Sequence, residues 1–158
     1  MFQVGDKVVY PMHGAGIIEA IEEREVLGEV RRYYVMHLPV GNMKVMVPLN
    51  CEDDLGLRQV IAPAQVEQVV SVLQDRQTNG TLAWNRRYRA NLEKIKSGDI
   101  LKVADVVRSL ARREKEKGLS TGEKKMYENA CQILISELVL AEESEEQQVR
   151  RWLHKLLA

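Results

Sequence analysis

The chain has 158 residues, and its 23 Lys and Arg balance 23 Asp and Glu, so the formal net charge is zero. This balance excludes a protein that binds nucleic acid through an overall positive charge, and any basic surface must be local. No run of 18 apolar residues is present, which excludes a membrane-spanning helix, and the N-terminus lacks the apolar core of a signal peptide. We expect a cytoplasmic protein in which Cys51 and Cys131 are inert thiols, because their spacing matches no disulfide or metal pattern.

The first third of the chain has the pattern of an antiparallel sheet. Tyr34, Met36 and Leu38 recur at every second position, which places them on one face of a strand. About 50 residues bury little area as an open sheet, so we expect this segment to close into a small barrel. The candidate strands, separated by Gly- and Pro-containing turns, are Lys7–Tyr10, Gly16–Glu22, Tyr33–Leu38 and Lys44–Val47.

From about residue 60 the hydrophobic period changes to that of a helix. Pro63 suits the first turn of a helix that carries Val66, Val69 and Leu73. Four further helices are expected: one from Thr81 to Ser97, one from Ile100 to a stop at Gly118, one after the cap Ser120, and one after Ser144. The sequence therefore predicts an α+β protein of two domains. Residues 1–54 form an antiparallel β-barrel, and residues 60–158 form an all-α bundle of about five helices.

Charge is segregated along the chain. The segment from Trp84 to Lys125 has 13 Lys and Arg against 6 Asp and Glu. Residues 1–83 have 7 against 11, and residues 126–158 have 3 against 6. A basic segment between acidic ones is typical of a local surface that binds a polyanion.

The basic segment begins with an aromatic residue among arginines. The guanidinium groups of Arg86, Arg87 and Arg89 suit phosphate oxygens, and the indole of Trp84 suits stacking on a base or insertion into a groove. The alternative is structural, because Trp84 and Tyr88 share one helical face with two aliphatic residues. Periodicity by itself favours burial of Trp84 in the core over contact with DNA.

A second basic cluster runs from Arg108 to Lys117, and there the helix C-terminus explains the cations as well as phosphate contact does. Lys124 and Lys125 fit this structural explanation less well, because a helix N-terminus repels cations. The three histidines lie in separate elements without neighbouring ligands, so we expect no metal site, no cofactor and no catalytic activity.

The segment VGDKVVYPMHGAGIIEAIE, which starts at Val4, resembles the opening of the CarD/CdnL family of bacterial transcription regulators. It is also similar to the polymerase-interacting domain of transcription-repair coupling factors. The helical half makes the resemblance specific and extends it over nearly the whole chain. The segments that resemble the family's C-terminal domain are Trp84 to Lys94, Ser97–Asp99, KVADVVRSLARRE from Lys102, and GLSTGEKKM from Gly118.

The resemblance implies a Tudor-like (SH3-like) barrel that binds the β subunit of RNA polymerase by pairing an exposed strand edge. Arg24 matches a position that contributes to this contact. Family members often have Arg where this chain has Met46, which removes a charge from the interface. The candidate strand before Pro48 consists of Lys44, Val45, Met46 and Val47.

The resemblance also implies that Trp84 inserts as a wedge into the minor groove at the upstream edge of the promoter bubble. Arg86, Arg87, Arg89 and Lys124 are then candidate contacts to the DNA backbone. The expected function is stabilisation of the open promoter complex, for example at ribosomal RNA promoters, by a monomer without membrane association that joins the nucleoid through RNA polymerase. A helical adaptor that binds only proteins is the alternative.

Overall fold

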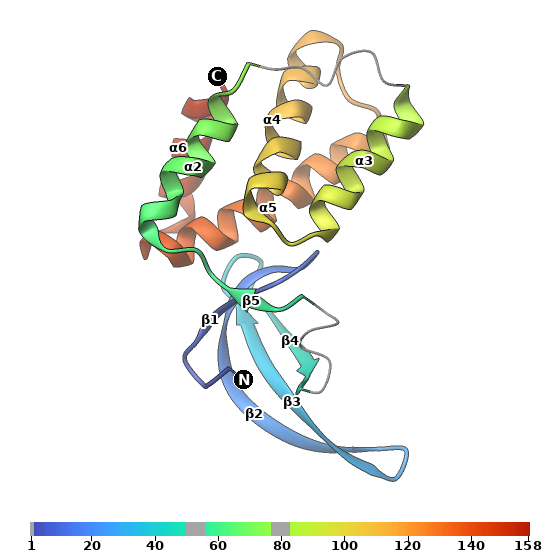
Figure 1. The fold of residues 1–158 in the computed structure, drawn as a ribbon, viewed down its shortest axis with the longest axis vertical. Coiled ribbons are helices and arrows are strands. Elements are labelled where there is room, and N and C mark those ends of the chain that lie inside the picture. Colours follow the sequence, from blue (N-terminus) through green and yellow to red (C-terminus); the bar gives the residue numbers. More distant parts are fainter. Residues whose placement is uncertain (1, 50–55, 77–82) are drawn as a thin grey trace.

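The computed structural model describes residues 2–49, 56–76 and 83–158, which form an N-terminal β-domain and a C-terminal helical domain (Figure 1). The predicted fold class, an α+β protein with an antiparallel β-domain followed by five helices, is confirmed. The expected cap Thr81 and the thiol of Cys51 lie outside the described residues.

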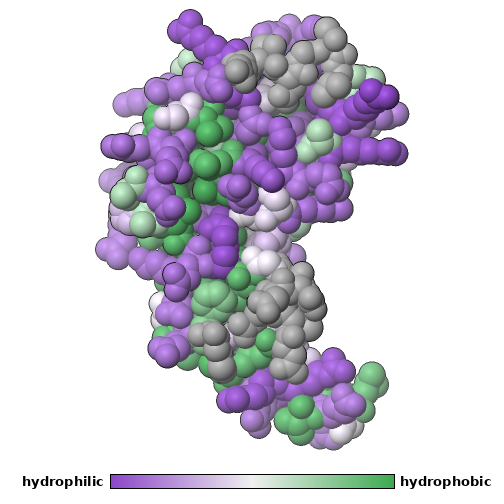
Figure 2. Space-filling model, viewed as in Figure 1, coloured by the Kyte–Doolittle hydropathy of each residue, from purple (hydrophilic) through white to green (hydrophobic). Residues whose placement is uncertain are grey.

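The β-domain is one antiparallel sheet with the strand order β4-β3-β2-β1-β5. A β-bulge between Ile18 and Ala20 increases the bend of β2. β2 and β3 run further than their apolar pattern predicts and form a long curved hairpin (Figure 1). Apolar side chains gather at its tip (Figure 2). The strands are β1 (Lys7–Tyr10), β2 (Gly14–Val26), β3 (Glu29–Leu38), β4 (Met43–Pro48) and β5 (Arg58–Gln59).

The core of the β-domain consists of the alternating apolar residues that predicted its strands. Tyr34, Met36 and Leu38 of β3 pack with Val8 of β1 and Val47 of β4. β5 was not predicted, because its two residues have no pattern of their own and join the sheet through pairing with β1. The sheet thus extends beyond the expected domain end at residue 54.

The helical domain has five α-helices among its described residues. The predicted stops are confirmed at Gly98 and Gly118, whose positive φ angles of 74° and 76° suit glycine after a helix. Ser120 is confirmed as an N-cap, whereas Ser144 is not, because its helix starts later with Glu145 as the cap. The helices are α2 (Val66–Gln74, after a short turn η2 at Pro63–Gln65), α3 (Trp84–Lys96), α4 (Ile100–Glu116), α5 (Thr121–Glu142) and α6 (Glu146–Leu157).

The second half of α5 packs directly against the β-domain. The backbone N–H of Ala15 donates to the Ser136 hydroxyl over 2.8 Å, and a Cβ atom on Gly14 would lie 2.8 Å from the same oxygen. Val9 and Ala15 form an apolar cluster with Leu140 of α5. This close approach makes the two domains one packed unit rather than two units on a free linker.

A buried carboxylate, Glu137, is the centre of the interface between the domains. Its side chain is 1% exposed, and Arg58 donates two hydrogen bonds of 2.7 Å to its two oxygens. The backbone N–H of Ile61 donates a third hydrogen bond of 2.9 Å, and Arg58 also donates to the Gly98 carbonyl. A buried carboxylate is stable only when it is paired in this manner. Glu137 therefore ties β5 and the following segment to α5.

We predict that Glu137→Ala lowers the free energy of unfolding by about 2–4 kcal/mol, because it leaves the Arg58 guanidinium, which is 30% exposed, without its partner. Glu142→Ala, on an exposed position of the same helix, is the matched control and should change the stability by less than about 0.5 kcal/mol. Urea unfolding followed by circular dichroism measures both, and equal effects of the two variants would contradict the assigned role of Glu137.

Candidate nucleic-acid interface

Trp84 is the first residue of α3, at the end of the helical domain that points away from the β-domain (Figure 1). The residue is 43% exposed. Its indole Nε1–H donates to the Ser120 hydroxyl over 3.2 Å, and its ring stacks on Tyr88 with centroids 5.0 Å apart and planes at 17°. The ring is therefore held on the surface and not sealed inside the bundle.

The expectation from periodicity that Trp84 belongs to the core is wrong. The buried face of α3 consists of Arg87, Asn91 and Ile95, while Trp84 is exposed and Tyr88 is half-buried. Ile95 is buried, and Tyr88 and Leu92 pack against the core, so the apolar stripe is kept in the later turns of α3. Trp84 is exposed because it lies at the first position of the helix. Arg87 is buried beside the stripe, because its guanidinium has a carboxylate partner inside the domain.

Arg87 forms a buried ion pair with Glu123 in the first turn of α5. Its Nε and Nη2 donate to the two Glu123 oxygens over 3.0 and 3.2 Å. The side chains are 10% and 2% exposed, and Arg113 approaches the same carboxylate at 3.7 Å. Ser120 and Glu123 have the spacing of a capping box, and the backbone N–H of Glu123 does donate to Ser120. The Glu123 side chain binds Arg87, so the guanidinium of Arg87 faces the interior of the helical domain.

The other cations of the basic segment divide into internal and exposed groups. Lys94 pairs with Asp105, and the buried Arg108 pairs with Asp75 and Asp105. The exposed cations near the start of α3 and in the first turn of α5 make no ion pair with any residue that the structure describes; they are Arg86, Arg89, Lys124 and Lys125. Figure 2 shows strongly hydrophilic side chains at this end of the molecule.

The convergence of these two helix starts was not visible in the sequence, because 35 positions separate Arg89 from Lys124. The buried ion pair between Arg87 and Glu123 joins the two helix starts, and the hydrogen bond from Trp84 to Ser120 adds to this contact at the surface. The exposed ring and the exposed cations of both helices therefore lie at the same end of the helical domain. Two helix N-termini add backbone N–H donors, which favour phosphate oxygens.

The predicted polymerase-binding strand, β4, is an edge of the described sheet and pairs only with β3. Val47 is fully buried and Val45 packs at the rim of the core, whereas Met46 is half-buried. Lys44 is exposed, and its Nζ lies 3.3 Å from the Oε2 of Glu19. The side of β4 that faces away from β3 therefore has backbone groups that could pair with another strand. The side chains of Val45 and Val47 hold β4 in the β-domain.

Arg24 is exposed on β2 and makes a 3.3 Å ion pair with Glu22. It lies opposite Arg31 of β3, two residues along that strand from Tyr33, which pairs with Pro48. The structure thus brings Arg24 near the C-terminal end of β4, with β3 between them.

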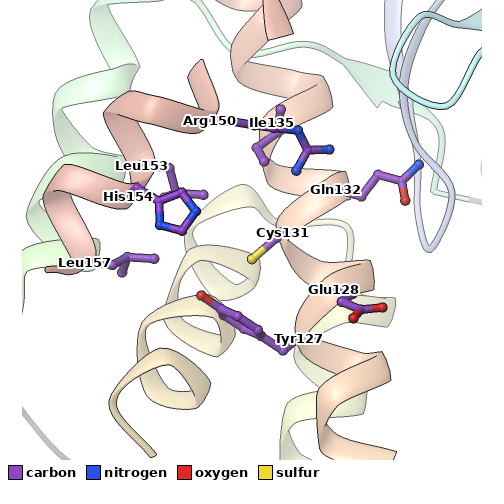
Figure 3. A pocket seen from close by; sticks show the side chains of 9 residues that line it. All are labelled: Tyr127, Glu128, Cys131, Gln132, Ile135, Arg150, Leu153, His154 and Leu157. Carbon is purple, nitrogen blue, oxygen red and sulfur yellow. The ribbon is translucent and has the colours of Figure 1, made fainter. Parts of the chain in front are cut away.

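A cavity of about 370 Å³ between α5 and α6 raises the question of catalysis, since Tyr127, Cys131 and His154 line it (Figure 3). Burial raises the pKa of the Cys131 thiol to about 11, and burial also raises the pKa of the Tyr127 hydroxyl. The thiol is therefore protonated at neutral pH and is a poor nucleophile.

Among residues 2–49, 56–76 and 83–158, no three His, Cys, Asp or Glu side chains are grouped to hold a metal ion. Within the same ranges, no helix is both long and apolar enough to cross a bilayer.

The fold and the exposed site define a protein of two domains. One has β4 as an edge strand of the described sheet, and the other has an exposed indole and exposed cations at two helix starts. Residues 2–61 match the CarD-like/TRCF RID domain, and residues 68–154 match the C-terminal domain of CarD. The chain belongs to the CarD family of transcription factors.

One relative agrees with this assignment. The chain is 45% identical over 150 residues to the candidate transcription factor YdeB of Bacillus subtilis (strain 168), covering 95% of this chain and 98% of that protein. It is 34% identical to the 72-residue N-terminal domain of Myxococcus xanthus CarD, whose solution NMR structure matches 37% of this chain and 79% of that domain with a TM-score of 0.33.

We predict that Arg87→Met lowers the free energy of unfolding by about 3–5 kcal/mol, because the buried carboxyl group of Glu123 would lose its main partner. Arg86→Met, at the neighbouring exposed position, is the matched control and should change the stability by less than about 0.5 kcal/mol. Urea unfolding of the two variants separates an internal arginine from an exposed one, and a stable Arg87→Met protein would refute the structural role.

Proposed function

We propose that this protein binds the β subunit of RNA polymerase through β4 and stabilises the open promoter complex by inserting Trp84 into the minor groove at the upstream edge of the bubble. The observation that carries this proposal is the exposed indole at the start of α3, at the same end of the helical domain as exposed cations of α3 and α5. A large ring that wedges between base steps favours distorted DNA over a regular duplex.

The cations around the ring supply the contacts to the DNA backbone in this proposal. Arg86, Arg89 and Lys124 are exposed and suited to phosphate oxygens. Arg87 is left out of this set, because its guanidinium is engaged inside the domain by Glu123. In this proposal the protein recognises the shape of the DNA rather than base edges, so we expect little sequence specificity. Because the backbone contacts are ionic and few, we expect a weak, salt-sensitive affinity for free DNA.

The proposed contact with polymerase is β-augmentation, in which the backbone of β4 pairs with a strand of the β subunit. Met46 carries no charge, so the affinity rests mainly on backbone hydrogen bonds and on Arg24. Val45 and Val47 hold β4 against the core of the β-domain, which fixes the position of the strand for this pairing.

The polymerase contact at β4 and the DNA contact at Trp84 can act together only if the distance between them is fixed. The interface between α5 and the β-domain fixes this distance, because Ser136 and Glu137 bind backbone groups and a side chain of β2, β5 and the segment after β5. The protein is then a non-enzymatic regulator that acts at the nucleoid in the cytoplasm while it is bound to polymerase, and a monomer is sufficient.

A modest preference of the protein for melted DNA is enough to change the occupancy of the open complex. Melting DNA costs about 1.4 kcal/mol of stacking for each base-pair step. A ligand shifts an equilibrium only by its differential affinity for the two states. A preference of about 1–3 kcal/mol for the open complex changes its occupancy about 5- to 150-fold.

We predict that Trp84→Ala shortens the lifetime of the open complex on a ribosomal RNA promoter to that measured without the protein, since the wedge is lost. Binding to the β subunit and the melting temperature should remain those of the wild type, because the indole is largely outside the core. Lifetimes after a competitor challenge measure the effect, and an unchanged lifetime would overturn the proposed function.

Binding to forked and duplex DNA separates this function from that of an adaptor that contacts only proteins. We expect preferential binding of the wild type to the fork and loss of this preference in Trp84→Ala. An adaptor would show no preference in either protein.

We further predict that one of the two variants Val45→Pro and Met46→Pro abolishes polymerase binding without unfolding the domain. Backbone N–H groups of neighbouring residues in an antiparallel edge strand point alternately to the partner strand and away from it. Only one of the two prolines therefore removes a hydrogen bond to β3, and thermal unfolding identifies which. If the variant that unfolds like the wild type also binds polymerase like the wild type, strand pairing is refuted.

A further inference from the structure

A chain of hydrogen bonds links the exposed indole of Trp84 to the buried ion pair beneath it. The indole Nε1–H donates to the Ser120 Oγ over 3.2 Å, and the same oxygen accepts the backbone N–H of Glu123 over 3.2 Å. The Glu123 carboxylate in turn binds Arg87. Ser120 is thus both the N-cap of α5 and the only polar partner of the indole among the residues that the structure describes.

One face of the indole ring has a partner as well. Tyr88, one helical turn after Trp84, stacks under the indole. A Cβ atom on Gly122 would lie 3.8 Å from both rings, which shows that the first turn of α5 lies against the pair. The indole is thus restrained by a hydrogen bond at its nitrogen and by a ring on one face.

This arrangement is unusual for a surface tryptophan at the start of a helix. Such a side chain ordinarily has several rotamers, and ordering it upon binding costs conformational entropy. Because the indole is already restrained in the free protein, this entropy cost is lower when Trp84 binds DNA. The polar group of the indole is also satisfied within the protein, so the ring presents mainly carbon atoms to its partner.

We infer that Ser120 is a positioning residue for Trp84: its hydroxyl holds the indole in the orientation in which it meets DNA. The inference rests on the proposed function for its effect on promoters, but the restraint on the ring is a property of the free protein. The two claims are therefore tested by separate measurements.

The first measurement concerns the ring in the free full-length chain. The chain has two tryptophans, so a Trp152→Phe background leaves Trp84 as the only tryptophan emitter. In this background, Ser120→Gly removes the hydroxyl but keeps a residue that is tolerated at an N-cap, whereas Ser120→Thr keeps both the hydroxyl and the cap. We expect a lower fluorescence anisotropy of Trp84 and stronger quenching by acrylamide in Ser120→Gly, and values near those of the Ser120 protein in Ser120→Thr.

The second measurement uses the native background and RNA polymerase holoenzyme on a ribosomal RNA promoter. Loss of one hydrogen bond should shorten the open-complex lifetime about two- to tenfold in Ser120→Gly, and Ser120→Thr should restore it. Polymerase binding and the far-ultraviolet circular dichroism spectrum should be unchanged in both variants.

The outcomes are distinct. If Trp84→Ala shortens the lifetime but Ser120→Gly does not, the positioning role is wrong and the proposed function stands. If Ser120→Gly shortens the lifetime while the anisotropy of Trp84 is unchanged, the serine acts only as a helix cap and the inference is overturned. If Trp84→Ala has no effect on the lifetime, the proposed function itself fails, and the anisotropy still decides whether Ser120 restrains the ring.

Discussion

The buried carboxylate of Glu137 is the interaction on which the arrangement of this protein depends. A charged group that is 1% exposed is stable only with several donors, and here they come from Arg58 and from the backbone of Ile61. Because those donors belong to β5 and to the segment after it, the ion pair determines where the sheet meets the helices. The strand edge at β4 and the indole at α3 lie in different domains, so their separation follows from this contact.

Helix α5 connects the two ends of the molecule. Its first turn contains Ser120 as the cap and Glu123 as the partner of Arg87, and its second half contains Ser136 and Glu137. The two glutamates are 14 positions apart, which corresponds to about 21 Å at 1.5 Å per residue. Because α5 is one continuous helix, its contact with the β-domain determines where its first turn lies at the other end of the helical domain. Its buried polar residues therefore sit where α5 meets a neighbouring helix or the sheet.

The basic segment shows that a local excess of cations is not the same as a basic surface. Lys94 and Arg108 are neutralised by aspartates within the helical domain, and Arg87 by a buried glutamate. The exposed remainder lies at the starts of α3 and α5. Under the proposed function, these few cations suit a chain of zero net charge that would bind DNA only while polymerase holds it nearby.

The sequence by itself determined the two domains, the positions of the four longer strands and the ends of most helices. These features depend on local rules: periods of 2 and 3.6, glycine at a positive φ angle, and a serine cap. The resemblance carried by the motifs identified the family. Trp84 was located by sequence at the start of its helix, but its exposure was not, since periodicity placed it on the apolar face.

Only the tertiary structure decided which charged residues are internal. In the sequence, Glu137 interrupts the apolar residues of its helix, Glu123 follows Ser120 at the spacing of a capping box, and Arg87 does not differ from Arg86 and Arg89. Their partners lie 79 and 36 positions away in the chain, so no local pattern connects them. The physical reason is that a buried ion pair depends on how elements pack against one another, and that packing is specified by the whole fold rather than by any one segment.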